Sequence, residues 1–234
     1  MLSLAKTPMG RILSDLPVRY FDATLEGLEN IPAKGAALLV GNHAYMGLDG
    51  AVLGALLLER LGRFPRFLGD RILFRHEPFR SILHALGAVE GEPGAAEELL
   101  AAGELVVVYP GGAEDALKPS REKHRLMWGD RRGFAKVAIR AGAPIVPVCA
   151  IGIDDMVHVV GKERFLGRFL FGSARYDLPI AFGRFGLPIP RRSPQRYIAL
   201  PPIDTAGDPD DSDHVERVRA EAYDAIEAVL AEVR

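Results

Sequence analysis

Three runs of consecutive apolar residues constrain the fold of this 234-residue chain more than any other feature. They lie at residues 36–40, 105–109 and 145–151, and each is followed directly by glycine or proline. A strand that is apolar throughout, rather than at every second residue, is buried on both faces. The three runs therefore predict strands inside a sheet that is covered on both sides.

The segments between these runs have helical patterns, so strands and helices alternate along the chain. The predicted helices are residues 51–60, 79–86, 95–102, 133–141 and 214–234, and the further predicted strands are residues 24–28, 66–68 and 197–200. Alternation of this kind is typical of an α/β fold with a mostly parallel central sheet flanked by helices on both faces. We expect a single domain at residues 24–234, preceded by an N-terminal amphipathic segment at residues 1–23.

Composition narrows the class of protein. The net charge of −2 gives no global attraction to nucleic acid, so no nucleic-acid partner is expected. The single cysteine excludes an intrachain disulfide. No apolar run reaches the length of about 18 residues that a spanning helix needs, and the first residues lack the apolar core of a signal peptide. The expected location is cytoplasmic, with peripheral contact at the inner face of a membrane.

A histidine and an aspartate follow the first apolar run. Asp49 lies six residues after His43, at the start of a predicted helix. On a continuous helix six residues turn through about 240°, so the side chains can meet only across a loop, which Gly47 permits. Such a pair forms a general base that takes a proton from an alcohol. The alternative is structural, with Asp49 as a helix N-cap and with Asn42 and His43 bonded to backbone groups.

A turn with two glycines follows the second apolar run, at Tyr109, Pro110, Gly111 and Gly112. Paired glycines let the backbone approach a ligand and direct N–H groups at an oxyanion or a phosphate. In open α/β sheets ligands bind beyond the carboxyl ends of the strands, where this turn is expected. The alternative is a plain Pro-Gly turn without a ligand.

Four motifs in order give the chain a family resemblance. They are Asn42-His43 with Asp49, the block at residues 109–115, the block at residues 133–138 and the block at residues 142–148. Together they resemble the glycerolipid acyltransferase superfamily of lysophospholipid acyltransferase-like enzymes. The chain is most similar to the monoacylglycerol/diacylglycerol acyltransferase-like branch, over residues 25–203.

This resemblance implies a role for each matching residue. His43 matches the catalytic histidine of the family, and Asp49 matches its charge-relay partner. Pro144 and Pro147 match a block implicated in binding the acyl donor or in shaping the site. The acceptor or oxyanion site would comprise Asn42, Tyr109, Pro110, Gly111, Gly112 and Glu114.

Three features of the chain depart from the family pattern. Five residues separate His43 from Asp49, where four are commonest, and Gly111 stands where the lysophosphatidate enzymes carry a glutamate. Those enzymes also hold glycerol phosphate with an arginine, but the corresponding stretch here contains Glu90 and Glu92. Because these carboxylates would repel a phosphate, we expect a neutral acceptor such as a mono- or diacylglycerol or another alcohol.

The expected activity is O-acyl transfer without a covalent acyl-enzyme. The acyl donor, acyl-CoA or acyl carrier protein, is a co-substrate, and neither a bound cofactor nor a metal site is expected. The expected partners are this donor, a lipid or alcohol acceptor and a membrane surface. Two alternatives stay open: a non-catalytic lipid-binding protein on the same fold, and a thioester hydrolase in which His43 activates water.

Basic residues are concentrated in two places. The first set follows the glycine turn and consists of Lys118, Arg121, Lys123, His124 and Arg125. It could bind the phosphates of coenzyme A or an anionic lipid, or it could be a solvated loop. The second set, Arg164 and Arg168 with residues 169–171, combines arginine with apolar side chains. It could contact a membrane or form an ordinary surface helix.

Overall fold

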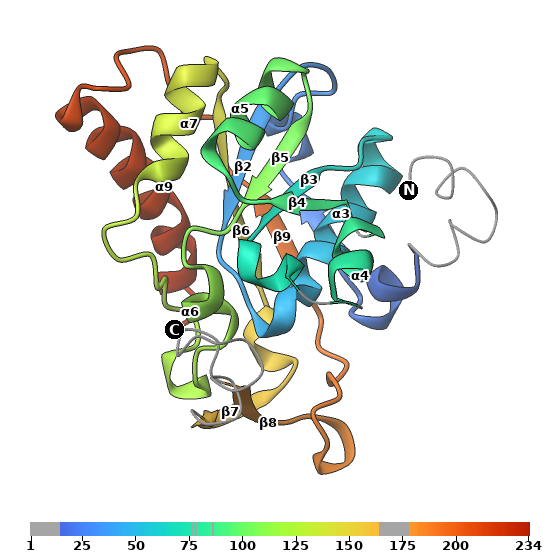
Figure 1. Ribbon diagram of the computed structural model, residues 1–234. Coiled ribbons are helices and arrows are strands. Elements are labelled where there is room, and N and C mark those ends of the chain that lie inside the picture. Colours follow the sequence, from blue (N-terminus) through green and yellow to red (C-terminus); the bar gives the residue numbers. More distant parts are fainter. Residues whose placement is uncertain (1–14, 76, 78, 86, 164–177) are drawn as a thin grey trace.

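A seven-stranded sheet forms the centre of the computed structural model, which describes residues 15–75, 77, 79–85, 87–163 and 178–234 (Figure 1). The strands are β1 (Thr24–Glu26), β2 (Ala37–Gly41), β3 (Arg66–Gly69), β4 (Ala88–Glu90), β5 (Leu105–Val108), β6 (Ile145–Ile151) and β9 (Arg196–Ala199). Their spatial order is β1-β9-β6-β2-β5-β3-β4. All neighbours are parallel except β6 and β9, which are antiparallel. The mostly parallel sheet is therefore confirmed.

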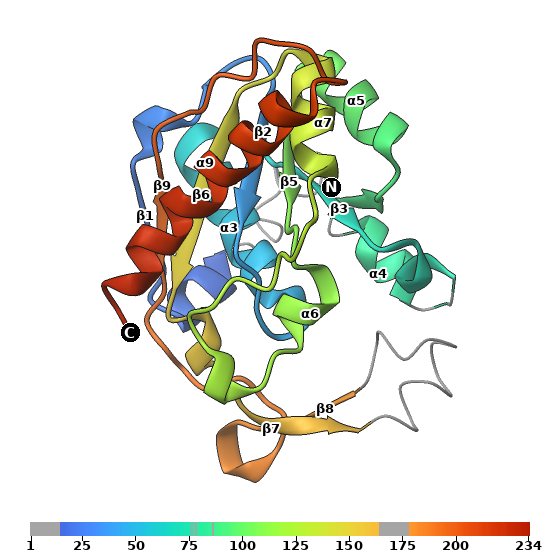
Figure 2. The same ribbon diagram turned by 90° about the vertical axis from the view of Figure 1, so that its left-hand side faces the viewer.

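Helices cover both faces of this sheet, as the apolar strands predict. Helix α3 (Leu48–Leu61) packs on one face, where its Leu53 joins a core cluster with Leu39 of β2. On the other face Leu38 joins a second cluster with α5 (Pro93–Ala101), α7 (Gly133–Ala141) and α9 (Ser212–Ala231). Figure 2 shows α5, α7 and α9 side by side on this second face. Adjacent residues of β2 thus supply both cores, which explains its unbroken apolar run.

The limits of several elements agree with the sequence. Helix α7 and strand β6 begin and end at the predicted residues, and Gly142 ends α7 with φ 59°. Four elements were not predicted among the strands and α-helices described: β4, the short helix α6 (Gly112–Ala116), and the two strands of a hairpin, β7 (His158–Glu163) and β8 (Leu178–Phe182). Helix α4 (Phe79–Ala85) packs against β4 at the edge of the sheet.

Some predictions fall on residues that the structure does not describe. The basic and aromatic set at Arg164, Arg168 and residues 169–171 lies outside the described residues, as do residues 1–14 of the N-terminal segment. Residues 15–20 of that segment are helical. Within the described part of the chain, no helix combines the length and the apolar character needed to cross a membrane.

Candidate active site

The predicted site residues emerge at the carboxyl ends of two adjacent strands. Strands β2 and β5 are paired in parallel, with Val40 opposite Val108. The loop that carries His43 and the turn that carries Tyr109 therefore leave the sheet next to each other. This is the edge at which open α/β sheets bind ligands.

His43 and Asp49 are in direct contact. Nδ1 of His43 lies 2.9 Å from Oδ2 of Asp49. A short turn at Tyr45–Gly47 separates them, and Gly47, with φ 79°, is the N-cap of α3. The loop that the spacing required is thus present, and the N-cap role considered for Asp49 is wrong because Gly47 occupies that position. The Asp49 side chain instead points back to His43 from the first turn of the helix.

The carboxylate of Asp49 is shielded from solvent. Asp49 is fully buried, and its Oδ1 accepts a hydrogen bond from the Ala44 N–H at 3.4 Å. The side chain of His43 retains 15% of its exposure. Among the described residues Nε2 of His43 has no hydrogen-bond partner, so this nitrogen can accept a proton from a substrate. Removing bulk water from a carboxylate strengthens its interaction with an imidazolium.

The ring of Tyr109 forms one wall beside the histidine. It stacks on the imidazole with ring centroids 4.0 Å apart and an interplanar angle of 10°. Burial, followed by the nearby Asp49 carboxylate, raises the pKa of Tyr109 well above its usual value. Tyr109 therefore stays neutral at physiological pH and fixes the plane of the imidazole by packing.

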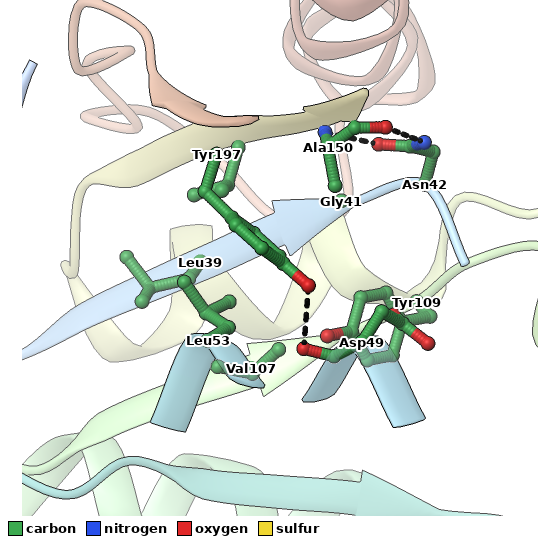
Figure 3. A pocket seen from close by; sticks show the side chains of 10 residues that line it. Leu39, Gly41, Asn42, Asp49, Leu53, Val107, Tyr109, Ala150 and Tyr197 are labelled. Carbon is green, nitrogen blue, oxygen red and sulfur yellow. Dashed lines mark hydrogen bonds between the residues drawn. The ribbon is translucent and has the colours of Figure 1, made fainter. Parts of the chain in front are cut away.

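A small pocket lies beneath the pair, between the sheet and α3 (Figure 3). Tyr197 of β9 points into it, and its hydroxyl hydrogen-bonds the backbone carbonyl of Asp49 at 3.1 Å. The same hydroxyl lies 2.8 Å from Oε1 of Gln195. Strand β9 thus supports the start of α3, and with it the position of the Asp49 side chain.

Asn42 bonds to the neighbouring strand. Its side-chain nitrogen donates to the Ala150 carbonyl, and its side-chain oxygen accepts from the Ala150 N–H, both at 2.8 Å. The amide thereby continues the pairing of β2 with β6 beyond the last backbone pair. This is the structural role considered for Asn42, and it holds the residue before His43 in place.

The glycine turn is built around a buried acid. The N–H of Gly112 donates to the Tyr109 carbonyl at 2.9 Å and so closes the turn internally. Gly111 has no room for a side chain, because a Cβ there would lie 2.2 Å from Oδ2 of Asp115. Pro110 is buried in the same turn, and Glu114 pairs at the surface with Arg131 at 2.8 Å. Binding of an oxyanion by this turn stays a prediction. The Gly112 N–H is already bonded to the Tyr109 carbonyl and is therefore not free to donate to an oxyanion.

Asp115 is fully buried close to the histidine. Burial raises its pKa to about 6, while Lys118, the Met127 N–H and His43 oppose that rise. Its Oδ1 accepts from the Met127 N–H at 2.9 Å, and Oδ2 has no partner among the described residues. Burial of Asp115 could not be predicted from its place in the glycine block, since an aspartate after a turn is usually solvated.

The basic run does not form a single surface. Lys118 is buried, with its Nζ 3.4 Å from Asp154 and 3.7 Å from Asp115. His124 is also buried, and burial lowers the pKa of its imidazole. Lys123 pairs with Asp155 at 3.2 Å and Arg125 with Glu122 at 3.0 Å, whereas the side chain of Arg121 is 74% exposed. Binding of the donor by this run stays a prediction, with Arg121 its most exposed member.

The structure brings Asn42, His43, Asp49 and Tyr109 together and adds Tyr197 and Asp115. Tyr197 was missed because it lies 148 residues from Asp49 in a late strand with no motif of its own. Among the described residues no group of three or more His, Cys, Asp or Glu side chains is arranged to hold a metal ion.

Comparison with known proteins identifies relatives. The human "DGAT1/2-independent enzyme synthesizing storage lipids" (Homo sapiens) is 34% identical over 161 residues, or 69% of this chain and 49% of that protein. Phytyl ester synthase 1 of Arabidopsis thaliana is 30% identical over 142 residues, covering 58% of this chain and 20% of that protein. The chain thus spans about half the length of the storage-lipid enzyme.

A solved structure shares the fold. The 1-acyl-sn-glycerophosphate acyltransferase PlsC of Thermotoga maritima superposes with a TM-score of 0.58 at 17% identity, covering 94% of this chain and 79% of that one. Residues 22–151, more than half of the chain, match the family described as Acyltransferase. The chain therefore belongs to the acyltransferase family.

Proposed function

We propose that this chain transfers a fatty acyl group from a thioester, acyl-CoA or acyl carrier protein, to a hydroxyl of a neutral glyceride or another alcohol. The observation that carries the proposal is the 2.9 Å contact between His43 Nδ1 and a fully buried Asp49 carboxylate. This contact lies beyond the carboxyl ends of the parallel strands β2 and β5, in a chain that belongs to the acyltransferase family.

The two side chains have separate tasks. Asp49 accepts the Nδ1–H of His43, which leaves Nε2 unprotonated, and its charge stabilises the imidazolium that forms. Nε2 removes the proton from the acceptor hydroxyl as the oxygen attacks the thioester carbonyl. Backbone N–H groups stabilise the oxyanion of the tetrahedral intermediate.

Collapse of that intermediate completes the transfer. The carbon–sulfur bond breaks, the ester stays with the acceptor, and the thiolate leaves and takes the proton back from His43. No covalent acyl-enzyme forms, because the acceptor hydroxyl is itself the nucleophile. Donor and acceptor must therefore be bound together before the reaction.

The choice of a neutral acceptor rests on charge and on similarity. The chain carries Glu90 and Glu92 in the stretch that, by the family resemblance, corresponds to the phosphate-holding stretch of the lysophosphatidate enzymes. Arg71 pairs with Glu92 at 2.7 Å, which weakens the repulsion from that carboxylate, so the argument from charge depends mainly on Glu90. The name of the human relative, an enzyme synthesizing storage lipids, supports an acceptor of that lipid class.

Product analysis tests the proposal. The purified chain is incubated with radiolabelled oleoyl-CoA and, in parallel, with monoolein, diolein, a long-chain alcohol and lysophosphatidic acid. We expect labelled ester with the neutral acceptors and less with lysophosphatidic acid. Labelled free fatty acid as the sole product would identify a hydrolase, and lipid binding without turnover of any acceptor would identify a binding protein.

A further inference from the structure

Exposed apolar side chains are concentrated on one part of the molecule. Of the eight large hydrophobic residues that are exposed in the described part of the chain, six belong to the β7–β8 hairpin and to the loop that follows it. These six residues, here called the apolar face, are Val160, Ile180, Phe182, Phe185, Leu187 and Ile189. Exposed apolar side chains that gather on one segment of a chain are typical of sites of protein or membrane contact.

The hairpin presents apolar residues on both of its sides. Val159 and Ala181 are paired with each other and are buried against the core. Their neighbours along the two strands are exposed: Val160 follows Val159, and Ile180 and Phe182 flank Ala181. A two-stranded sheet with one face in water normally carries polar residues on that face. The apolar residues on the outward side of the hairpin are therefore typical of a surface that contacts a partner or a membrane.

The loop after β8 holds its apolar residues outward by backbone bonds. Gly183 N–H donates to the Leu187 carbonyl at 2.6 Å, and Arg184 N–H to the Ile189 carbonyl at 2.8 Å. Phe185 has a φ of 58°, which is uncommon for a bulky residue, and is 84% exposed. Backbone strain of this kind persists where the surroundings hold it and is common at functional sites.

The charges on β8 and on the loop that follows it have one sign, whereas β7 carries both Lys162 and Glu163. Between Leu178 and Gln195 the chain carries three arginines, Arg184, Arg191 and Arg192, and no aspartate or glutamate. The guanidinium of Arg184 lies 5.2 Å from the centroid of the Phe185 ring. Aromatic and aliphatic side chains beside arginine suit the interface of a membrane that contains anionic lipids.

The apolar face lies beside the proposed active site. The hydroxyl of Tyr45, two residues after His43, donates to the Pro188 carbonyl at 3.4 Å. A pocket next to the histidine is lined by Ala44 and Tyr45, by Asp115, and by Val159 of the hairpin. Figure 2 shows the hairpin projecting beyond α6, at one end of the molecule. A surface on which the hairpin rests would thus lie close to the reacting groups.

We propose that the apolar face docks the enzyme on a phospholipid bilayer that contains anionic lipids. Phe185, Leu187 and Ile189 enter the interfacial region, and Arg184 and Arg192 contact lipid headgroups. The choice of a bilayer rather than another apolar partner rests on the proposed function, since a water-insoluble glyceride reaches the site from a membrane.

Co-sedimentation with vesicles tests this proposal in the full chain. The affinity for mixed phosphatidylcholine and phosphatidylglycerol vesicles should fall by about tenfold or more in the Phe185→Ser/Leu187→Ser/Ile189→Ser variant. This variant loses the apolar area that the wild type buries in the membrane. Arg184→Glu/Arg192→Glu should lose about tenfold on these vesicles and little on pure phosphatidylcholine. Val233→Ser, an exposed apolar residue near the C-terminus, should bind like the wild type.

Fluorescence locates the insertion directly. Trp128 is fully buried, so a Phe185→Trp variant supplies the only exposed indole. Its emission should shift to shorter wavelength when vesicles are added, whereas that of a Val233→Trp control should not. The near-ultraviolet circular dichroism of Trp128 reports whether each variant is folded.

Three results would overturn the docking surface. They are a wild type that does not bind vesicles, a triple-serine variant that binds them unchanged, and a Phe185-dependent dimer in light scattering with vesicle binding unaffected. Turnover of a short-chain, water-soluble acceptor separates this inference from the proposed function. Vesicle binding that depends on Phe185, in a protein that forms no ester, would uphold docking while removing the acyltransferase assignment.

Discussion

At the scale of single residues, the site depends on a carboxylate that water does not reach. Asp49 is fully buried and fixed by the Ala44 N–H as well as by His43. Its charge costs free energy to bury, and a partner that becomes cationic during the reaction recovers part of that cost. This arrangement favours the protonated imidazole at the moment of transfer more than a solvated aspartate could.

The Asp49→Asn variant tests this role. The amide keeps the shape of the side chain but removes the charge that stabilises the imidazolium and the acceptor for Nδ1–H. We expect kcat/KM for acyl transfer to fall by about 100-fold or more. Asp155→Asn, at a surface aspartate that pairs with Lys123, is the matched control and should retain activity. Near wild-type turnover in Asp49→Asn would rule out the proposed pair.

Asp115 predicts a dependence of stability on pH. Burial raises its pKa from 3.8 to about 6. The folded protein therefore binds more protons than the unfolded chain between about pH 4 and pH 6, and this contribution to stability falls as pH rises through that window. The loss amounts to about 3 kcal/mol, and Asp115→Asn should not show it. Urea unfolding at pH 4 and pH 7 measures the difference between the two proteins, and parallel pH profiles would contradict the account.

At the scale of elements, the turn from β5 into α6 depends on one missing side chain. A Cβ at Gly111 would lie 2.2 Å from Oδ2 and 2.8 Å from Cβ of Asp115, whose side chain is fully buried. Gly111→Ala should lower the free energy of unfolding by about 1–3 kcal/mol. Gly133→Ala, at the first residue of α7 with no atom within 4 Å of the added carbon, should leave stability unchanged or slightly raised. Thermal unfolding of both variants decides the point, and equal melting temperatures would contradict it.

Buried elements were more predictable than exposed ones. Strand β6 and helix α7 have the predicted limits because burial on both faces gives an unbroken apolar run and Gly142 ends the helix. The β7–β8 hairpin was missed because its outward residues are apolar. Apolar and polar residues therefore do not alternate along its strands as they do in a strand with one face in water. Helix α6 was missed because it begins at Gly112, and paired glycines indicate a loop.

At the scale of the whole molecule, the site collects residues that are far apart in the chain. His43 and Asp49 are close in sequence, and the loop they need could be predicted from Gly47. The partners of Asn42 and Asp49 could not, because Ala150 lies 108 residues from Asn42 and Tyr197 lies 148 residues from Asp49. Those contacts arise from the order of the strands, which no local pattern in one sequence specifies.

The arrangement of the whole molecule suits acyl transfer to a lipid. The sheet ends that carry His43 and the glycine turn, the buried Asp115 and the apolar face all meet at one end of the molecule. A long acyl chain and a water-insoluble acceptor can then reach the histidine from one side. The opposite ends of the strands take no part in the proposed chemistry.

The role of His43 as the general base is tested by measuring acyl transfer by His43→Ala and by the wild type under saturating oleoyl-CoA and diolein. Loss of the general base should lower kcat by about 10²- to 10⁴-fold, with the melting temperature and the near-ultraviolet signal of Trp128 unchanged. Ester formation at the wild-type rate by a folded His43→Ala protein would rule out His43 as the general base.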